Sequence, residues 1–341
     1  MSEPAAPSEV AYPGLVFETL TAYRRTAALK GAIDLDLFSA VAGGARSVAA
    51  IGARCGASER GVRILCDCMV WLGFLRKDGD RYDLTPTAAQ FLDRNSPQYM
   101  GGMAGFLDAP AIAAAFSDVA AAVRHGGTVL EGEGTMRPEH PVWVDFARSM
   151  AARATLTAEP LVTLLAPGAG RSPKILDVAA GHGLFGIAFL ERFPAAEVVA
   201  VDWPAVLEQA RANARTAGVA ERFRTVAGDV FTAGIGDGYD VVLIANFLHH
   251  FDAPTCVRLL RRLHAALAPG GRAATLDFVP DDDRVGPGSV SLFNLTMLAT
   301  TPRGEAHTFA EYEAMFREAG FSRSELCPLP PTPQRVVLSH R

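Results

Sequence analysis

The stretch that decides the fold is 175-ILDVAAGHGLFG-186, a mostly apolar run followed by a glycine-rich loop. Gly181, Gly183 and Gly186 match the spacing GxGxxG, which follows a strand and opens a helix in nucleotide-binding sheets. Around this stretch, strand-like segments alternate with helix-like segments. Such alternation predicts a mostly parallel sheet with helices on both faces, so we expect an α/β, Rossmann-like domain here.

The expected elements of this domain follow from hydrophobic period and from turn residues. Strands are expected at 174–179, 197–202, 223–229, 240–246 and 272–279, with helices at 184–193, 204–217 and 253–267. A helix at 308–319 and two strands, 322–327 and 335–340, close the chain. We expect this terminal hairpin to add one antiparallel strand to the edge of the sheet.

The segment 47–75 has the pattern of a helix-turn-helix, in which Ser47 and Ser58 are suited to cap the two helices and Gly56 permits the turn. A hairpin signal at Asp78-Gly79 follows, and the two together predict a winged helix. Upstream, residues 15–41 read as two helices with a break around Gly31 and Asp34.

Three parts are therefore expected in this chain of 341 residues. Residues 1–100 form a mainly α winged-helix dimerisation domain, 101–168 a helical connector that lines the substrate pocket, and 169–341 the sheet domain. A boundary is placed at Pro167 to Gly170, where prolines and glycines cluster.

Composition excludes several classes of protein. The net charge of -5 gives no general attraction to nucleic acid or to anionic lipid, and 49% hydrophobic residues suit a compact fold. The five cysteines are odd in number and show no metal-ligand spacing, so we expect free thiols and no bound metal. Without an apolar run long enough to span a bilayer, we expect no membrane partner and a cytoplasmic location.

Three acids indicate which cofactor the glycine loop holds. Asp177 lies four residues before the first glycine, where it would repel a pyrophosphate but attract the cationic amino group and sulfonium of S-adenosylmethionine. Asp202 is suited to accept both ribose hydroxyls, and Asp229 to accept the adenine amino group. Each acid alone is as well explained by a capping role, but three in register favour S-adenosylmethionine.

Other residues near these strand ends complete the predicted cofactor site. Gly181 and Gly183 form the loop, while Val230 and Asn246 follow the third and fourth strands. Trp203 is suited to cover one face of the adenine, although a core indole explains it equally well.

The chain resembles the class I methyltransferases, specifically the small-molecule O-methyltransferase family with an N-terminal winged-helix dimerisation domain. The motifs that carry the resemblance are 175-ILDVAAGHG-183, 199-VAVDWP-204 and 249-HHFD-252, and it extends over nearly the whole chain. Where the family usually has two more glycines, this chain has Ala179 and Ala180, which are small enough for the same loop.

The resemblance implies a general base and a residue that orients it. His249 matches the family's catalytic histidine, while His250 stands where the family commonly has Asp, so for His250 a capping or packing role is equally open. The family supplies an orienting carboxylate from a loop before the penultimate helix. Glu305 is the acid nearest the expected place, with His307 as a competing occupant and a solvated loop carboxylate as the plainer alternative.

Aromatic and methionine side chains at helical spacing are suited to line an apolar acceptor pocket, although plain core packing is the better explanation for most of them. The acceptor is then a small, flat molecule, a phenol or a polyketide-like ring, that is methylated on a hydroxyl. Beside His250, the candidate pocket residues are Phe146, Met150, Phe293, Asn294 and Met297.

Two other classes of function were weighed against this one. A winged helix is typical of DNA-binding regulators, but the segment 58–73 is too apolar to read a groove and favours a homodimer interface instead. A nicotinamide-dependent oxidoreductase conflicts with Asp177. Within the resembled family, carbon methylation and cofactor binding without methylation stay open.

Overall fold

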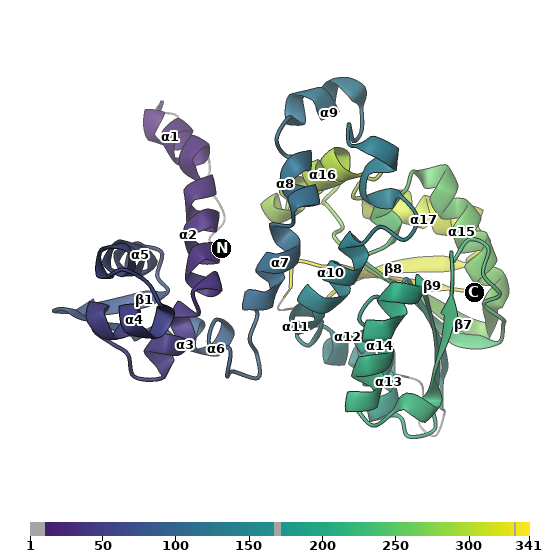
Figure 1. The fold of residues 1–341 in the computed structure, drawn as a ribbon. Helices are drawn as coiled ribbons and strands as arrows, with labels where there is room; N and C mark the ends of the chain where they lie inside the picture. The colour runs from purple at the N-terminus through teal and green to yellow at the C-terminus, as the bar shows by residue number, and fades with distance from the viewer. Residues whose placement is uncertain (1–10, 167–171, 331) are drawn as a thin grey trace. The chain divides into compact units, whose positions relative to one another are not determined.

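The computed structural model describes residues 11–166, 172–330 and 332–341 (Figure 1). The chain divides into two compact units, Met1–Ala104 and Gly105–Arg341. The helices that were expected as a connector belong, from Gly105 onward, to the same unit as the sheet. The boundary predicted at Pro167 to Gly170 lies outside the described residues.

The first unit contains the predicted winged helix. Ser47 caps α4 (Val48–Cys55) by accepting the N–H of Ala50 at 3.3 Å, and Ser58 caps α5 (Glu59–Trp71) by accepting the N–H of Gly61 at 3.2 Å. Gly56 has a φ of 63°, the left-handed conformation that the turn requires. The hairpin is formed by strands β1 (Leu75–Asp78) and β2 (Arg81–Leu84).

The helices before the winged helix break at a different place from the one predicted. Helix α2 runs through Gly31, and the chain turns at Asp36, whose φ is 53°. A further break at Ala22 separates α1 from α2. The remaining helices of this unit are α1 (Pro13–Thr21), α2 (Tyr23–Asp34), α3 (Leu37–Ala42), α6 (Pro86–Phe91) and the 3-10 turn η1 (Gly101–Met103).

The second unit is built on a seven-stranded sheet in the order β5-β4-β3-β6-β7-β9-β8. Neighbours from β5 to β7 run parallel, whereas β9 is antiparallel to both β7 and β8. The antiparallel strand therefore lies inside the sheet, and β8 forms the edge, which corrects the expected placement. The strands are β3 (Lys174–Val178), β4 (Glu197–Asp202), β5 (Phe223–Ala227), β6 (Tyr239–Ala245), β7 (Leu267–Asp277), β8 (Arg323–Pro328) and β9 (Arg335–His340).

Helices cover both faces of this sheet (Figure 1). One face packs on α12 (Ala158–Leu164), α13 (Leu184–Arg192) and α14 (Pro204–Thr216). The other packs on α15 (Ala253–Ala266) and α17 (Phe309–Glu318). Alternate residues of each buried strand enter the two cores, as Ile175 and Leu176 do, which explains why the central strands are apolar throughout.

A set of short helices precedes the sheet, within the segment expected to be a helical connector. Prolines at helix starts, such as Pro110, and glycines with positive φ, such as Gly126 and Gly134, divide the segment. These helices are α7 (Ala104–Leu107), α8 (Pro110–Ala115), α9 (Val119–His125), η2 (Glu131–Met136), α10 (Val142–Ser149) and α11 (Ala151–Ala154). Helix α16 (Gly288–Thr300) contacts α8, α9 and η2. In the described part of the chain, no helix has the length and apolarity needed to cross a membrane.

Candidate active site

The glycine loop is held against the sheet by Asp177. Its Oδ2 accepts the N–H of Gly186 at 3.2 Å, and a Cβ on Gly186 would lie 3.0 Å from that oxygen and 2.8 Å from Val198. Gly186 thus permits the close approach of α13 to the sheet. Asp177 is buried and lines neither of the two cavities described below, and the direct contact with a cofactor that we expected stays a prediction.

Burial also changes the charge of this acid. Desolvation raises the pKa of Asp177 to about 8, and the charge of Asp202 adds to the rise, while the hydrogen bond from Gly186 opposes it. Its Oδ1 has no hydrogen-bond partner among the described residues. Asp177 is therefore first a support of the loop.

A cavity of about 350 Å³ lies at the carboxyl ends of β3, β4 and β6, the edge at which ligands bind in open α/β sheets. Most of the residues predicted for the cofactor line it, and we call it the cofactor cavity. Gly183 does not, because it starts α13 with a φ of 72° and packs against Ala210 and Phe223. The predicted residues in the lining are Gly181, Asp202, Trp203, Asp229, Val230 and Asn246.

The acids of this cavity are held by backbone groups. Asp202 accepts the N–H of Gly181 at 2.8 Å and that of Trp203 at 2.6 Å, and Asp229 accepts the N–H of Phe231 at 2.9 Å. Burial raises the pKa of Asp202 to about 6, although both backbone N–H groups act against the rise. Each carboxylate keeps acceptor capacity for a ligand hydroxyl or amino group.

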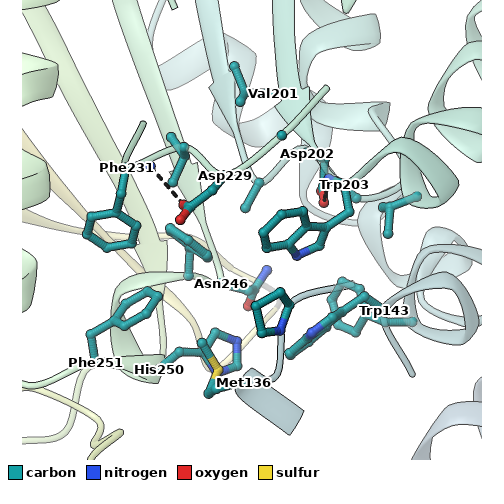
Figure 2. A pocket seen from close by; sticks show the side chains of 18 of the residues that line it. Met136, Trp143, Val201, Asp202, Trp203, Asp229, Phe231, Asn246, His250 and Phe251 are labelled. Carbon is teal, nitrogen blue, oxygen red and sulfur yellow. Dashed lines mark hydrogen bonds between the residues drawn. The ribbon is translucent and has the colours of Figure 1, made fainter. Parts of the chain in front are cut away.

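Figure 2 shows how these side chains surround the cavity. Trp203 and Asp229 lie on one side and Met136 and His250 on the other, with Asn246 between them. Two acceptors for hydroxyl and amino groups beside an indole face fit the adenosine part of S-adenosylmethionine, which carries no phosphate. These residues would hold that cofactor.

A second cavity of about 240 Å³ is lined by most of the residues predicted for the acceptor, and we call it the acceptor cavity. Phe146, Met150, His250, Phe293 and Met297, which the sequence predicted for the acceptor, line this cavity. Asn294 does not, since its Oδ1 accepts the N–H of Ala306 at 2.9 Å. Trp143, Phe146, Asn246 and His250 line both cavities and so form a common wall.

His249 reaches the acceptor cavity from the 3-10 turn η4 (Leu248–His250), which follows β6. Its Nδ1 lies 2.6 Å from Oδ1 of Asp277, the last residue of the neighbouring strand β7. Tyr312 donates to the other oxygen of Asp277 at 2.8 Å, and the N–H of Phe278 donates to Oδ1 at 2.7 Å. Because Asp277 occupies Nδ1, the nitrogen that remains for a ligand is Nε2.

Tyr312 stays protonated in this cluster. Burial and the adjacent Asp277 raise its pKa well above the ordinary value, so its hydroxyl serves as a donor. The order Tyr312, Asp277, His249 is a buried hydrogen-bonded chain that ends on the acceptor cavity, the arrangement that orients a catalytic imidazole in other enzymes.

Glu305 does not orient His249, and that prediction was wrong. Its carboxylate pairs with Arg284 at 2.7 Å and is half exposed. His307 is not the orienting group either, because its Nε2 contacts the carbonyl oxygen of Phe251 at 3.1 Å. Asp277 could have been found from the sequence, because it lies near the end of the strand predicted at 272–279. We expected that strand to follow the one that precedes His249 in the same sheet.

His250 is a neutral neighbour of the proposed base. Burial and the adjacent His249 lower its pKa well below the ordinary value, and its Nδ1 has no hydrogen-bond partner in the described part of the chain. The ring packs edge-on against Trp143, with the centroids 5.0 Å apart, and against His249 at 4.3 Å. The common wall therefore presents an uncharged imidazole where the two cavities meet.

Asn246, also in this wall, is fixed by its backbone and by a distant residue. Its φ is 54°, a left-handed conformation that is uncommon outside glycine. Its Oδ1 accepts a hydrogen bond from Gln334 at 2.5 Å, and its N–H donates to Leu276 at 2.9 Å. Four residues that were not predicted from the sequence also line the acceptor cavity: Gln334, Trp143, Arg153 and Phe278.

Comparisons with known proteins identify the family. An O-methyltransferase domain model matches residues 116–322, and an O-methyltransferase dimerisation domain model matches residues 17–94. The first match spans more than half of the chain. This chain belongs to the O-methyltransferase family.

Relatives with high coverage support the same conclusion. The 3-hydroxy-5-methyl-1-naphthoate 3-O-methyltransferase of Streptomyces sahachiroi is 30% identical over 313 residues, covering 91% of this chain and 90% of the relative. A crystal structure from Nostoc punctiforme, described as a candidate O-methyltransferase, is 47% identical with a TM-score of 0.93 and covers 97% of this chain and 100% of that chain.

The fold is also that of human N-acetylserotonin methyltransferase, solved in complex with S-adenosylmethionine. That structure is 22% identical with a TM-score of 0.84, covering 98% of this chain and 99% of that chain. The protein is an S-adenosylmethionine-dependent O-methyltransferase. The match favours this class over the DNA-binding regulator and the oxidoreductase.

Proposed function

We propose that the protein methylates a hydroxyl group of a small aromatic or polyketide-like acceptor, with His249 as the general base. The observation that carries the proposal is the buried pair of His249 and Asp277 at the wall of an apolar cavity. The naphthoate relative is named for methyl transfer to an aromatic hydroxyl, which agrees with this class of acceptor.

The geometry of the pair suits removal of a proton. Asp277 holds the Nδ1–H tautomer of His249, so Nε2 carries the free lone pair and faces an acceptor hydroxyl. S-adenosylmethionine, when bound, supplies an electrophilic methyl group at its sulfonium. The side chains of Phe293, Met297 and Phe146 exclude water and align a flat ring, which is the larger part of what such a transfer needs.

The cofactor site is proposed from the first cavity. Asp202 accepts the ribose hydroxyls, Asp229 the adenine amino group, and Trp203 covers the ring. Gly181 lets the loop approach the ligand, because its φ of 57° is accessible to glycine. Val230 and Asn246 complete the lining.

The first unit pairs two copies of the chain in this proposal. Helix α1 buries none of its residues in the isolated chain, and Phe17, Leu20 and Trp71 are 72%, 69% and 69% exposed. Large exposed apolar patches of this kind mark interaction sites. The match to a dimerisation domain supports a second copy of the chain as the partner.

The experiment is a screen of aromatic hydroxyl compounds for release of demethylated cofactor, repeated with His249→Ala. We expect turnover with at least one compound, and a fall of about 10²- to 10⁴-fold in the variant with unchanged calorimetric affinity for S-adenosylmethionine. Full turnover by His249→Ala on a hydroxyl acceptor would remove the general base from the proposal.

A further inference from the structure

The acceptor cavity has one strongly basic wall residue. Arg153, in α11, lines this cavity and is not in the lining of the cofactor cavity. Its guanidinium carbon lies 4.9 Å from the centroid of the Phe278 ring, which lines the same cavity. Among the described residues, the Arg153 guanidinium forms no hydrogen bond and no ion pair.

The wall around Arg153 contains no Asp or Glu. Its other polar side chains are neutral or engaged. Thr135 and Thr157 donate their hydroxyls to backbone carbonyl oxygens, and Gln334 donates to Asn246. The described part of the cavity therefore supplies a cation without a resident counter-charge.

Such a cation calls for an anionic ligand. A partly desolvated guanidinium is costly unless it is paired, and its planar fork of donors matches a carboxylate at two points. Burial lowers the pKa of Arg153, in keeping with an environment that does not yet balance the charge. The cation–π contact with Phe278 fixes the side chain over the wall without neutralising it.

The position of Arg153 separates it from the proposed base. Phe278 stacks on Phe293 with centroids 4.2 Å apart, and Phe293 meets the ring of His249 edge-on at 4.7 Å. Two aromatic side chains thus lie between the cation and His249 along this wall. An anionic group bound by Arg153 is therefore attached to a different position of the acceptor from the hydroxyl that is methylated.

We propose that Arg153 binds a carboxylate of the acceptor, so that the substrate is an aromatic hydroxy acid rather than a neutral phenol. This inference rests on the proposed function, whose acceptor cavity it uses. The phenylalanine wall holds the ring, Arg153 holds the acid group, and the hydroxyl faces His249. The carboxylate orients the ring and is not itself methylated.

The methionine part of the cofactor offers a second source of carboxylate. The structure favours the acceptor, because Arg153 lines only the cavity that contains His249, Phe293 and Met297. If Arg153 binds the acceptor, its replacement weakens binding of the acceptor. If it binds the methionine carboxylate, its replacement weakens binding of the cofactor.

The test uses a hydroxynaphthoic acid and the naphthol that has the same hydroxyl but no carboxylate. Calorimetry measures the affinity of each for the full-length protein saturated with S-adenosylhomocysteine, in wild type, Arg153→Met and Arg153→Lys. Arg148→Met is the matched control, since Arg148 is exposed on the preceding helix α10. The affinity for S-adenosylhomocysteine alone is measured in all four proteins.

We expect the wild type to bind the acid about 10- to 100-fold more tightly than the naphthol, from a charge-assisted pair of hydrogen bonds. That preference should vanish in Arg153→Met, persist in part in Arg153→Lys and be unchanged in Arg148→Met. Equal affinities in the wild type, binding of neither compound, or an Arg153→Met protein that loses cofactor affinity but keeps the preference would each overturn the proposal. Failure of the proposed function would show differently, as preferential binding of the acid with no methyl transfer to any hydroxyl.

Discussion

Replacing Asp277 by Asn tests the chemistry of the site with little change of shape. Asp277 is fully buried and accepts from His249, Phe278 and Tyr312. An amide oxygen at the Oδ1 position still accepts from His249 and from the backbone of Phe278. The amide nitrogen then faces the Tyr312 hydroxyl, which has acceptor capacity. The hydrogen-bond geometry is therefore retained while the negative charge is lost.

The size of the effect follows from that charge. Opposite charges about 4 Å apart in an effective dielectric constant of about 20 attract by about 4 kcal/mol, and a part of this acts while His249 gains its proton. We expect kcat to fall about 10²- to 10³-fold. The affinity for S-adenosylmethionine should stay within about twofold, because Asp277 does not line the cofactor cavity.

The assay measures release of demethylated cofactor at saturating concentrations of both substrates, with the best acceptor found in the screen. Circular dichroism and thermal melting verify the fold. Tyr312→Phe is the control, because it removes one hydrogen bond from Asp277 and leaves the charge, so kcat should fall about 10-fold at most. A folded Asp277→Asn protein with kcat near wild type, or an equal loss in Tyr312→Phe, would refute this reasoning.

Three further predictions concern stability and assembly. Gly186→Ala places a methyl group against Asp177 and Val198 and should cost about 1 to 3 kcal/mol in urea unfolding, whereas Gly234→Ala, with open space at its Cβ, should not; equal stabilities would contradict the tight approach of α13. In Asp177→Asn, a neutral amide replaces an acid whose folded-state pKa is raised from 3.8 to about 8. Between pH 4 and 8 this carboxyl is ionised in the unfolded wild-type chain but protonated in the folded one, so its contribution to the unfolding free energy falls with rising pH in the wild type and not in the variant. The variant's unfolding free energy, without cofactor, should therefore gain about 2 to 3 kcal/mol relative to wild type from pH 5 to 7, and a constant difference would exclude the raised pKa. Phe17→Glu combined with Leu20→Glu should give a monomer by light scattering, while the exposed Val285→Glu should not; a double variant that stays dimeric would place the interface elsewhere.

Much of the fold was predictable because the hydrophobic pattern of each segment matches the strand or helix that the segment forms in the sheet domain. The strands ending at Val178, Asp202 and Ala245 alternate with helices, as the hydrophobic pattern predicted, and the structure confirms these elements to within a few residues. The antiparallel strand was misplaced at the edge. Whether β8 or β9 pairs with β7 depends on long-range contacts that no local pattern contains.

The acids that line the first cavity were predictable for a related reason. Asp202 and Asp229 follow parallel strands, whose carboxyl ends meet at one edge, so their place near the cavity follows from topology alone. Asp177 supports the start of α13, and lines neither described cavity, because its side chain accepts the N–H of Gly186; the packing of α13 that brings these groups together is not visible in the local sequence. The same edge rule, applied to Asp277, would have identified the partner of His249.

The acceptor cavity was predicted least well. Phe293 and Met297 are four residues apart and share a face of α16, but Asn294 is turned about 100° from Phe293 and bonds to Ala306 instead. Arg153 was missed because α11 is too short to show a period. Its significance depends on the absence of an acid nearby, which is a property of the assembled wall and not of the local sequence.

The wall shared by the two cavities links the two binding equilibria. Since Trp143, Phe146, Asn246 and His250 contact both spaces, any shift of these side chains by one ligand changes the free energy of binding the other. Such coupling is reciprocal by thermodynamic necessity. An effort to alter acceptor choice at these four positions will therefore change cofactor affinity and product inhibition as well, whereas Phe293, Met297 and Arg153 offer positions at which the acceptor can be changed alone.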